Sequence, residues 1–451
     1  MTLNAQLQRH GLFDARVPRY TSYPPANHFG PFVNTSVMKR WLGHVAHDAQ
    51  ISLYIHIPFC RRLCWFCACR TQGIKTDSPL SHYVDTVRKE LAMVKAEMPE
   101  GVTLSRLHLG GGTPTILPPA LMTRLLSDVF ETFELTKNGE FSVEIDPTEI
   151  DEDRLEVLTQ FGMNRASIGV QDFDPKVQAA IGRPQSFAQT KWLSDALQAR
   201  GVCNLNMDVL YGLPHQNWAE LQTTLRQVAD LRPSRIAMFG YAHVPWMSKR
   251  QAMIPEDALP DPHLRLEHFD RAAAQLNTEG YQQIGIDHFA LPHDSLAKAA
   301  QSGALTRNFQ GYTDDTSDVL IGLGASSISK FPQGLAQNGS ATIEYSKAIN
   351  EGRLATKRGY MLNRYDKITG DIIEALMCHF KCDAHVIHQK NEICLEDIRA
   401  VLAKLHDRFA DVTTFDGTIF RIPPNARALT RIIVHGVDQF TPQDKTHSIA
   451  I

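Results

Sequence analysis

The chain places four of its eight cysteines in one short segment, FCRRLCWFCAC, which runs from Phe59 to Cys69. Cys60, Cys64 and Cys67 fit the spacing C-x3-C-x2-C, and Cys69 follows after a single residue. In a reducing compartment, clustered thiols indicate metal binding or catalysis rather than disulfides. Because thiolates hold both zinc and iron–sulfur clusters, the segment predicts a metal centre.

Zinc and reduced structural thiols are the alternatives to an iron–sulfur cluster. A structural zinc site is usually assembled from two spaced pairs of ligands. The sequence has no second C-x2-C or H-x3-H pair at a suitable distance, and its other cysteines are scattered, at positions 203, 378, 382 and 394. We expect those four to be small buried apolar residues. One continuous cysteine loop is therefore not typical of a structural zinc site.

The composition is that of a soluble globular protein. With 451 residues the chain is long enough for more than one domain, and 43% hydrophobic and 21% charged residues are ordinary fractions. A formal net charge of −3 argues against a general attraction to nucleic acid. No apolar run reaches the length of a signal peptide or a membrane span. We therefore expect a cytoplasmic protein with no membrane and no nucleic-acid partner.

Strands and helices alternate around the cysteine segment. Apolar and β-branched runs predict strands at 51–57, 105–109, 140–146, 164–170, 202–212 and 234–243. Amphipathic segments predict helices from about Leu80 and at 119–133, 152–162, 187–201 and 219–232. About six such units predict a parallel sheet covered by helices. Periodicity alone leaves open whether that sheet is doubly wound or curled into a barrel.

Polar and glycine-rich residues gather at the C-terminal ends of these strands. In chain order they are the cysteine segment, GGGTP at 110–114, Glu144 with Asp146, Gln171, Asp208 with Tyr211, and residues 241–243. Parallel α/β folds build their active sites at that edge. Because all of these strands would contribute to one site, we predict an α/β fold built on a partial (β/α)6 barrel.

The pattern changes after about residue 360. Residues 367–380 and 395–410 are amphipathic helical patterns, and 413–422 is a hairpin with Asp416-Gly417 at its turn. They predict a smaller, mostly helical, winged-helix-like C-terminal domain, without a basic recognition helix and so with a packing or substrate-covering role. The predicted division is an N-terminal arm (1–48), the barrel (49–290), a barrel extension and linker (291–360) and the C-terminal domain (361–451).

The C-x3-C-x2-C spacing resembles the cluster motif of the radical S-adenosylmethionine (SAM) superfamily. Full ligation of a [4Fe–4S] cluster takes four cysteines. The resemblance implies that three leave one iron open for the amino and carboxylate groups of SAM. The run from Gly110 to Pro114 resembles the superfamily's glycine segment, whose bare backbone approaches the SAM ammonium closely. A triple glycine alone is often only a tight turn, and its place one unit beyond the cysteines makes it informative.

Longer motifs narrow the resemblance. The chain is similar to oxygen-independent coproporphyrinogen-III oxidases (dehydrogenases) of haem biosynthesis, from about residue 18 to at least 375, through PRYTSYPPA (18–26), YIHIPFC, LGGGTPT, VEIDPTEI, SIGVQDF, NMDVLYGLP, GIDHFA and NFQGYT (308–313). The family is one of oxidoreductases. The resemblance implies radical oxidative decarboxylation of two propionate side chains of coproporphyrinogen III to vinyl groups, which gives protoporphyrinogen IX.

The resemblance also implies roles for individual residues. Cys60, Cys64 and Cys67 would hold the [4Fe–4S] cluster. Two SAM molecules are implied, the first contacted by Tyr54, Phe66, Gly111, Gly112, Thr113 and Glu144, the second by Gln171, Arg183, Asp208, Ala242 and Ile328. The implied catalytic or substrate-facing residues are Cys69, Tyr54, Phe309 and Gln310. The alternatives to these roles are an ordinary surface carboxylate for Glu144 and a spare thiol buried beside the cluster for Cys69.

Several expectations concern partners. They are coproporphyrinogen III, whose carboxylates Arg19 is a candidate to bind, and an unidentified electron donor and acceptor; we also expect a monomer. Two departures from the family, Pro25 in the arm and the cysteine-free segment 431–440, affect the expected lid and substrate contacts. The alternatives are a haem-binding chaperone of the same family and a nucleic-acid-modifying radical enzyme. The arm and Cys69 favour the dehydrogenase over the former, and the missing basic tract disfavours the latter.

Overall fold

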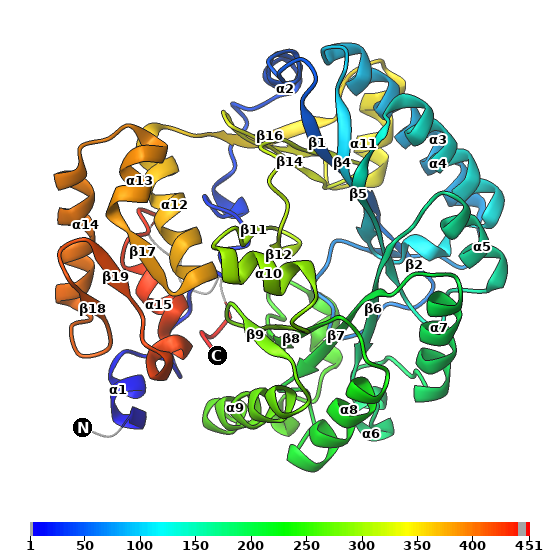
Figure 1. The fold of residues 1–451 in the computed structure, drawn as a ribbon. Coiled ribbons are helices and arrows are strands. Elements are labelled where there is room, and N and C mark those ends of the chain that lie inside the picture. The colour runs from blue at the N-terminus through cyan, green and yellow to red at the C-terminus, as the bar shows by residue number, and fades with distance from the viewer. Residues whose placement is uncertain (1–2, 441–447) are drawn as a thin grey trace.

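The computed structural model describes residues 3–440 and 448–451, and it confirms the predicted alternation of strands and helices (Figure 1). Six parallel strands lie side by side in chain order. They are β1 (Gln50–Ile57), β4 (Thr103–Gly111), β5 (Leu135–Ile145), β6 (Arg165–Gln171), β7 (Asn204–Tyr211) and β8 (Arg235–Gly240). Figure 1 shows the strands curving around the centre of the molecule.

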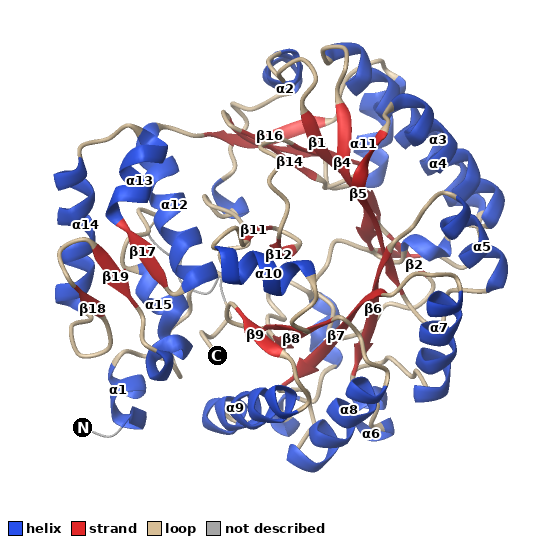
Figure 2. Ribbon diagram, in the orientation of Figure 1, coloured by secondary structure: helices blue, strands red, loops and turns tan. Residues whose placement is uncertain are grey.

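Helices cover the outer face of this curved sheet, as the separation of colours in Figure 2 shows. In chain order they are α3 (Ser78–Glu97), α4 (Pro119–Thr132), α5 (Glu152–Gln160), α6 (Pro175–Ala180), α7 (Phe187–Ala199), α8 (Trp218–Asp230) and α9 (Pro262–Thr278). Their starts follow local signals. Ser186 and Asn217, for example, form capping boxes at the first residues of α7 and α8.

The sheet extends beyond the six strands at both edges and stays open. Beside β1 lies β13 (Leu320–Leu323), which is parallel, followed by the antiparallel strands β14 (Ile328–Phe331), β15 (Gly334–Asn338) and β16 (Thr356–Met361). Beside β8 lie the antiparallel strands β10 (His288–Ala290) and β9 (Gln282–Ile284). Among the described residues, β16 and β9 are the free edges. The barrel is therefore partial, as predicted.

Side chains on the parallel strands alternate between an apolar outer face and a polar inner face. Leu107, Val143 and Met207 point outward and belong to one large buried core beneath the helices. Because successive strand residues point to opposite faces, their neighbours point inward. The inward residues include Tyr54, His108, Glu144, Ser167, Asp208 and Arg235. One face of the sheet thus packs in the hydrophobic core, and the other face lines the polar interior.

Ion pairs fill the N-terminal end of this interior. Arg106 lies 2.9 Å from Glu140 and 2.9 Å from Asp314, while Arg235 lies 2.6 Å from Asp294. Asp314 follows the hairpin of β11 (Thr306–Asn308) and β12 (Gly311–Thr313), and Asp294 caps α10 (Ser295–Ser302). Figure 1 shows the hairpin and α10 at the centre of the ring of strands. These pairs hold both inside the barrel, opposite the end that carries the cysteines.

The C-terminal unit has the predicted winged-helix-like character. Its elements are α12 (Arg364–His379), β17 (Lys381–Asp383), α13 (Ala384–Asn391), α14 (Leu395–Arg408), β18 (Thr414–Phe415), β19 (Ile419–Arg421) and α15 (Thr430–His435). The predicted helices correspond to α12 and α14, and the predicted hairpin to β18 and β19, with Gly417 at φ +88° in its turn. β17, α13 and α15 were not predicted, because each is short.

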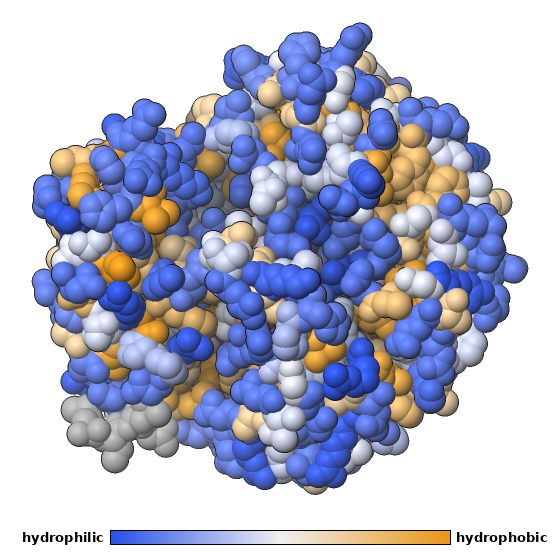
Figure 3. Space-filling model, viewed as in Figure 1, coloured by the Kyte–Doolittle hydropathy of each residue, from blue (hydrophilic) through white to orange (hydrophobic). Residues whose placement is uncertain are grey.

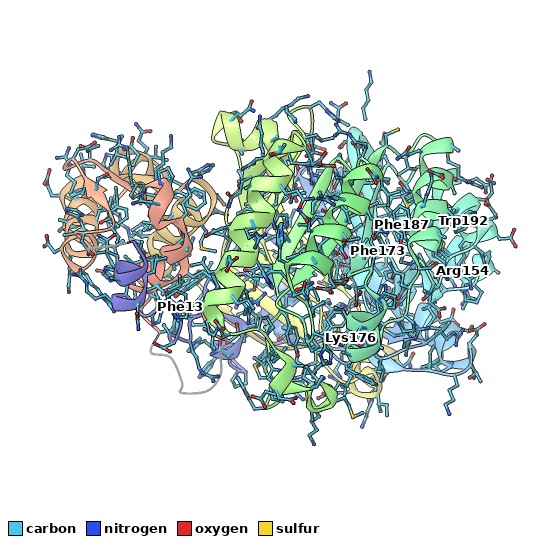
Figure 4. All side chains as sticks on the ribbon, turned by 90° about the horizontal axis from the view of Figure 1, so that it is seen from below. Phe13, Arg154, Phe173, Lys176, Phe187 and Trp192 are labelled. Carbon is cyan, nitrogen blue, oxygen red and sulfur yellow. The ribbon has the colours of Figure 1, made fainter. Side chains whose placement is uncertain are left out.

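The N-terminal segment divides its packing between the two units. α1 (Leu3–Arg9) and the chain that follows, including Phe13 and Tyr20, share a core with the C-terminal helices. α2 (Thr35–Gly43), by contrast, buries Trp41 in the barrel core. Figure 4 labels Phe13 beside α9, and its ring lies 3.8 Å from that of His263 there. The predicted boundaries at residues 48, 290 and 360 stay predictions.

No helix in the described part of the chain combines the length and the apolar run that crossing a bilayer requires.

Candidate active site

The polar interior forms a cavity of about 410 Å³ that reaches the C-terminal ends of the strands. Figure 3 shows hydrophilic residues gathered at the centre of the molecule, inside the ring of strands. The predicted site residues that line the cavity are Tyr54, Cys60, Cys64, Phe66, Cys67, Cys69, Gly111, Gly112, Thr113, Glu144, Gln171, Arg183, Asp208 and Gln310. Residues from the whole length of the barrel thus meet in one space.

Three predicted site residues do not line this cavity. Ala242 follows β8, and its carbonyl accepts a hydrogen bond from Gln251 at 3.0 Å. Ile328 begins β14 and faces neither of the two cavities described here. Phe309, at the tip of the β11–β12 hairpin, lines a second cavity of about 420 Å³, whereas its neighbour Gln310 lines the first. The proposed roles of these residues stay predictions.

The cysteine loop lies directly against the glycine segment. β2 (Phe59–Cys60) opens the loop and pairs with β3 (Gln72–Gly73), which closes it. A Cβ atom at Gly112 would lie 2.6 Å from the Phe59 carbonyl oxygen and 3.0 Å from Cys60 Sγ, so only glycine fits there. Within residues 3–440 and 448–451, no three histidine, cysteine, aspartate or glutamate side chains could hold a single metal ion. Three thiolates around one glycine-lined space fit a cluster with three cysteine ligands.

Cys69 is not enclosed in the core. The residue as a whole is exposed, and it lines the cavity. Its backbone N–H lies 3.4 Å from Cys67 Sγ, and its thiol also donates to that sulfur. The shared proton raises the pKa of Cys69 and lowers that of Cys67. The interpretation of Cys69 as a buried spare thiol therefore does not agree with its exposure.

A distant segment binds the backbone of the cysteine loop through side chains, and we call it the loop clamp. The clamp is Ser248, Arg250 and Gln251, in and before the short 3-10 helix η3 (Lys249–Met253). Ser248 donates to the carbonyl of Cys67 (2.9 Å), Arg250 to that of Cys69 (3.1 Å) and Gln251 to that of Phe66 (2.7 Å). These bonds fix the path of the chain between the cysteines.

Arg183 joins the cysteine loop to two strand ends. Its guanidinium lies 3.1 Å from Asp146 and 3.5 Å from Cys64 Sγ, and it donates to the carbonyl of Gly169 at 3.0 Å. Burial opposes the charge, but Asp146 and the Cys64 sulfur outweigh it and raise the pKa of Arg183. A permanent positive charge therefore stands beside the predicted cluster.

Glu144 lies inside the cavity rather than on the outer surface. Its carboxylate accepts from the Gly111 N–H at 3.0 Å and lies 3.3 Å from His108 Nε2. Burial would raise the pKa of Glu144, but the hydrogen bonds from His108 and Gly111 outweigh it and lower the pKa. The tyrosine ring of Tyr54 stacks on His108, with centroids 5.7 Å apart. Glu144 is thus held ionised, as an acceptor beside the glycine segment.

Asp208 differs from Glu144 in the direction of its pKa shift. Asn206 and Ser167 lie within hydrogen-bond reach, at 2.8 and 3.3 Å. Burial is the main cause that raises the pKa of Asp208 to about 6, and the charge of Glu144 contributes. Glu144 and Asp208, two of the carboxyl groups that line this cavity, therefore have pKa values shifted in opposite directions, an arrangement typical of functional sites.

Gln171 adopts a strained backbone conformation at the end of β6. Its φ is +66°, and the register of β6 against β7 shifts at this point. The next residue, Asp172, is buried and accepts hydrogen bonds from Gln216 (2.6 Å) and Thr224 (2.9 Å). These bonds anchor the chain immediately after Gln171 and direct its side chain into the cavity.

Sequence reasoning missed several residues of this site. His56 accepts or donates a 2.9 Å hydrogen bond with Tyr54, two residues earlier on the same face of β1, so strand alternation could have identified it. His108 follows the same rule on β4. The loop clamp gives no local signal, because its role depends on contacts across more than 180 residues of sequence.

Comparison with known proteins agrees with this geometry. The model of the radical SAM superfamily matches residues 54–228. An oxygen-independent coproporphyrinogen III oxidase from Paracoccus denitrificans (strain Pd 1222) is 50% identical over 100% of both chains. One from Escherichia coli (strain K12) is 36% identical over 94% of this chain and 93% of the relative. The solved structure of coproporphyrinogen III oxidase from Escherichia coli, described as a radical SAM enzyme, has a TM-score of 0.89 at 35% identity and covers 94% of this chain and 100% of its own.

Proposed function

The chain belongs to the oxygen-independent coproporphyrinogen III oxidase family of radical SAM enzymes, and on that premise we propose how its cavity carries out the reaction. It converts two propionate side chains of coproporphyrinogen III to vinyl groups and so forms protoporphyrinogen IX. The single observation that best supports this function is the meeting of the three-cysteine loop, the glycine segment and Glu144 in one cavity.

Cys60, Cys64 and Cys67 would hold a [4Fe–4S] cluster, which together with SAM would supply the one-electron chemistry of the reaction. The bare backbone of Gly111 and Gly112 allows the methionine part of SAM to approach the loop. These residues shape a space that larger side chains would fill.

Glu144 and Asp208 are proposed to bind the nucleoside parts of two SAM molecules. Glu144 is ionised and accepts hydrogen bonds from ribose hydroxyls, because its pKa is lowered. Tyr54, Phe66 and Thr113 line the cavity on the same side as Glu144 and complete the first set.

The second SAM set is proposed from the opposite strands. Gln171 and Asp208 offer hydrogen-bonding groups, and Arg183 offers a cation for the methionine carboxylate, although it already contacts Asp146 and Cys64. Ala242 and Ile328 complete the set by family likeness.

Each reaction removes a hydrogen atom, one CO2 and one electron from a propionate side chain. Removal of a hydrogen atom from the β-carbon leaves a carbon radical, which then loses CO2 and one electron as the vinyl double bond forms. An acceptor must take that electron, and a donor must reduce the cluster. Gln310 and Cys69 line the cavity and are proposed to face the reacting side chain, with Tyr54 and Phe309 nearby.

We also propose the setting in which the enzyme works. Its clustered thiols fit a reducing compartment, so we place it in the cytoplasm, as a monomer that takes electrons from one separate partner and passes them to another. The alternative of a haem-binding chaperone gains no support from the relatives named above, each of which is called an oxidase.

An anaerobic assay tests the function. The reconstituted protein is incubated with coproporphyrinogen III, SAM and a reductant, and the porphyrins are oxidised and separated. We expect about four irons per chain and products with one and then two vinyl groups. A protein that binds zinc in place of iron, or that binds haem stoichiometrically and forms no vinyl group, would contradict the proposal.

A further inference from the structure

Four arginines converge between the barrel and the C-terminal unit, outside the predicted SAM contacts. They are Arg19 in the arm, Arg265 in α9, Arg307 in β11 and Arg431 in α15, and we call them the arginine cluster. Each keeps partial exposure, although protein surrounds it closely. Four separate elements therefore bring positive charges close to one another.

The guanidinium groups are held by backbone carbonyls. Arg19 donates to Gly240 at 2.8 Å, and Arg265 donates to Tyr241 at 2.7 Å. Arg307 donates to the carbonyl of Arg19 at 2.8 Å, and Arg431 donates to that of Ala450. In the part of the chain that the structure describes, none of the four lies within 4.0 Å of a carboxylate oxygen. The carbonyls orient the cations without neutralising them.

One nearby carboxylate, Asp287, attracts members of the arginine cluster. It attracts Arg19, Arg307 and Arg431, but its oxygen is already 2.6 Å from His288 Nδ1. Burial and the repulsion between neighbouring guanidinium groups lower the pKa of Arg19, Arg265 and Arg431, the last to about 9. Cations that are largely enclosed and not paired with a carboxylate are costly, and an anion bound beside them would offset that cost.

The β11–β12 hairpin, which carries Arg307, adjoins both cavities. Arg307 and Tyr20 line the second cavity, while Tyr312, whose ring lies 5.1 Å from the Arg307 guanidinium, lines the first. Asn308 and Thr313, in the same hairpin as Arg307, line both. A ligand that extends from the cysteine side can therefore reach Arg307, and with it the arginine cluster, across the β11–β12 hairpin.

We propose that the arginine cluster binds those propionate carboxylates of the porphyrinogen that are not at the reacting position. This inference rests on the proposed function, since coproporphyrinogen III carries four carboxylates and each of its two reactions engages one. Arginine binds carboxylates through paired, charge-assisted hydrogen bonds, and Arg265 and Arg307 each have a buried Nε without a partner. Arg19 thereby becomes one member of a larger site.

The same charge balance favours product release. The substrate carries four negative charges and the product two, because each reaction removes one carboxylate as CO2. A site with four cations holds the substrate more tightly than the product. The enzyme would thus bind coproporphyrinogen III and release protoporphyrinogen IX by the same contacts.

Binding is tested without turnover, on the full-length protein, by titration with coproporphyrin III, the oxidised and fluorescent form with the same four carboxylates. Its tetramethyl ester is the uncharged control ligand. The variants are Arg265→Gln and Arg431→Gln, and Arg271→Gln is the matched control, since Arg271 lies on the same helix as Arg265 but is paired with Glu267 at the surface. Arg265→Lys and Arg431→Lys keep the charge and guard against misfolding.

The expected result is a loss of affinity for coproporphyrin III of about tenfold or more in each Gln variant, because a charge-assisted hydrogen bond is lost. The Lys variants recover part of it, Arg271→Gln binds as wild type, and the ester is insensitive to all changes. The KM for coproporphyrinogen III rises in parallel, while the cluster spectrum and SAM cleavage without substrate are unchanged. Wild-type binding by both Gln variants would overturn the arginine site. Failure of the wild type to form vinyl groups would instead overturn the proposed function.

Discussion

Cys69 lies two residues beyond Cys67 and lines the cavity, in hydrogen-bond contact with the Cys67 sulfur. A fourth permanent ligand would close the iron that SAM requires. We therefore propose that Cys69 acts on the substrate side, by holding a group or moving a proton or an electron.

The Cys69→Ser variant tests that role. We expect it to keep the iron content and the visible spectrum of the wild type but to lose most conversion of coproporphyrinogen III. Cys203→Ser, at an exposed position outside the cavity, is the control and should be fully active. Loss of the cluster would show that Cys69 is a ligand of it. Unchanged turnover would show that Cys69 serves only in packing.

Asp208 allows a prediction about stability and pH. Its pKa is raised to about 6, above the ordinary value of 3.8, so the folded state binds a proton that the unfolded chain has lost between those values. Stability therefore falls as pH rises from about 4 through about 6. Asp208→Asn removes this cost and should raise the free energy of unfolding at pH 7.5 by about 1–3 kcal/mol, with no gain below about pH 4.

Urea unfolding at several pH values measures that difference. Asp230→Asn, at the end of α8, is the control. The more stable Asp208→Asn protein should also lose vinyl formation, because a carboxylate in the proposed second SAM site is gone. Equal stability of Asp208→Asn and the wild type at pH 7.5 would show that the pKa of Asp208 is not raised in the folded protein.

At the scale of elements, the loop clamp is the feature that the cysteine spacing alone does not explain. Gln251 is buried and bonds to Phe66, Ala242 and Val244, whereas Lys249 in the same short helix is exposed. Replacing Gln251 leaves buried backbone groups without hydrogen-bond partners. Each such group lowers the stability of the folded state by about 1–3 kcal/mol.

Gln251→Ala should therefore assemble the cluster but lose it faster. We expect iron release to a chelator to be several times quicker than in the wild type, and the melting temperature to fall. Iron per chain is measured against time under anaerobic conditions, with Lys249→Ala as the control. A cluster in Gln251→Ala as durable as the wild-type one would show that the clamp does not hold the loop.

The elements also show what could be read from the sequence. The six parallel strands were predicted because each is an apolar run under a helix, although β5 begins at Leu135, earlier than the predicted 140. β9 to β16 were not predicted, since each is short, with three to six residues. Strand-end polarity located the cavity, but only three-dimensional contacts reveal the loop clamp and the arginine cluster.

At the scale of the whole molecule, the N-terminal segment ties the C-terminal unit to the barrel. Phe13 is buried in the core of the C-terminal unit and contacts His263 of α9, the helix that also carries Arg265. The arm that follows carries Arg19. The placement of the arginine cluster therefore depends on packing between the two ends of the chain.

Phe13→Ala should lower the free energy of unfolding by about 3–5 kcal/mol, as for other buried phenylalanines. At temperatures where the variant stays folded, the KM for coproporphyrinogen III should rise while SAM cleavage persists. Phe32→Ala, at a position 80% exposed in the same arm, is the control and should change neither quantity. If folded Phe13→Ala has the wild-type KM, the packing of Phe13 does not affect substrate binding.

The transfer of deuterium tests the central claim most directly. Coproporphyrinogen III deuterated at the β-carbons of its propionates is incubated anaerobically with the enzyme, SAM and a reductant, and the 5′-deoxyadenosine is analysed by mass spectrometry. The account predicts one deuterium per 5′-deoxyadenosine and one deuterium lost from each new vinyl group. Vinyl products accompanied by unlabelled 5′-deoxyadenosine would contradict it, because the hydrogen atom would then leave the substrate by another route.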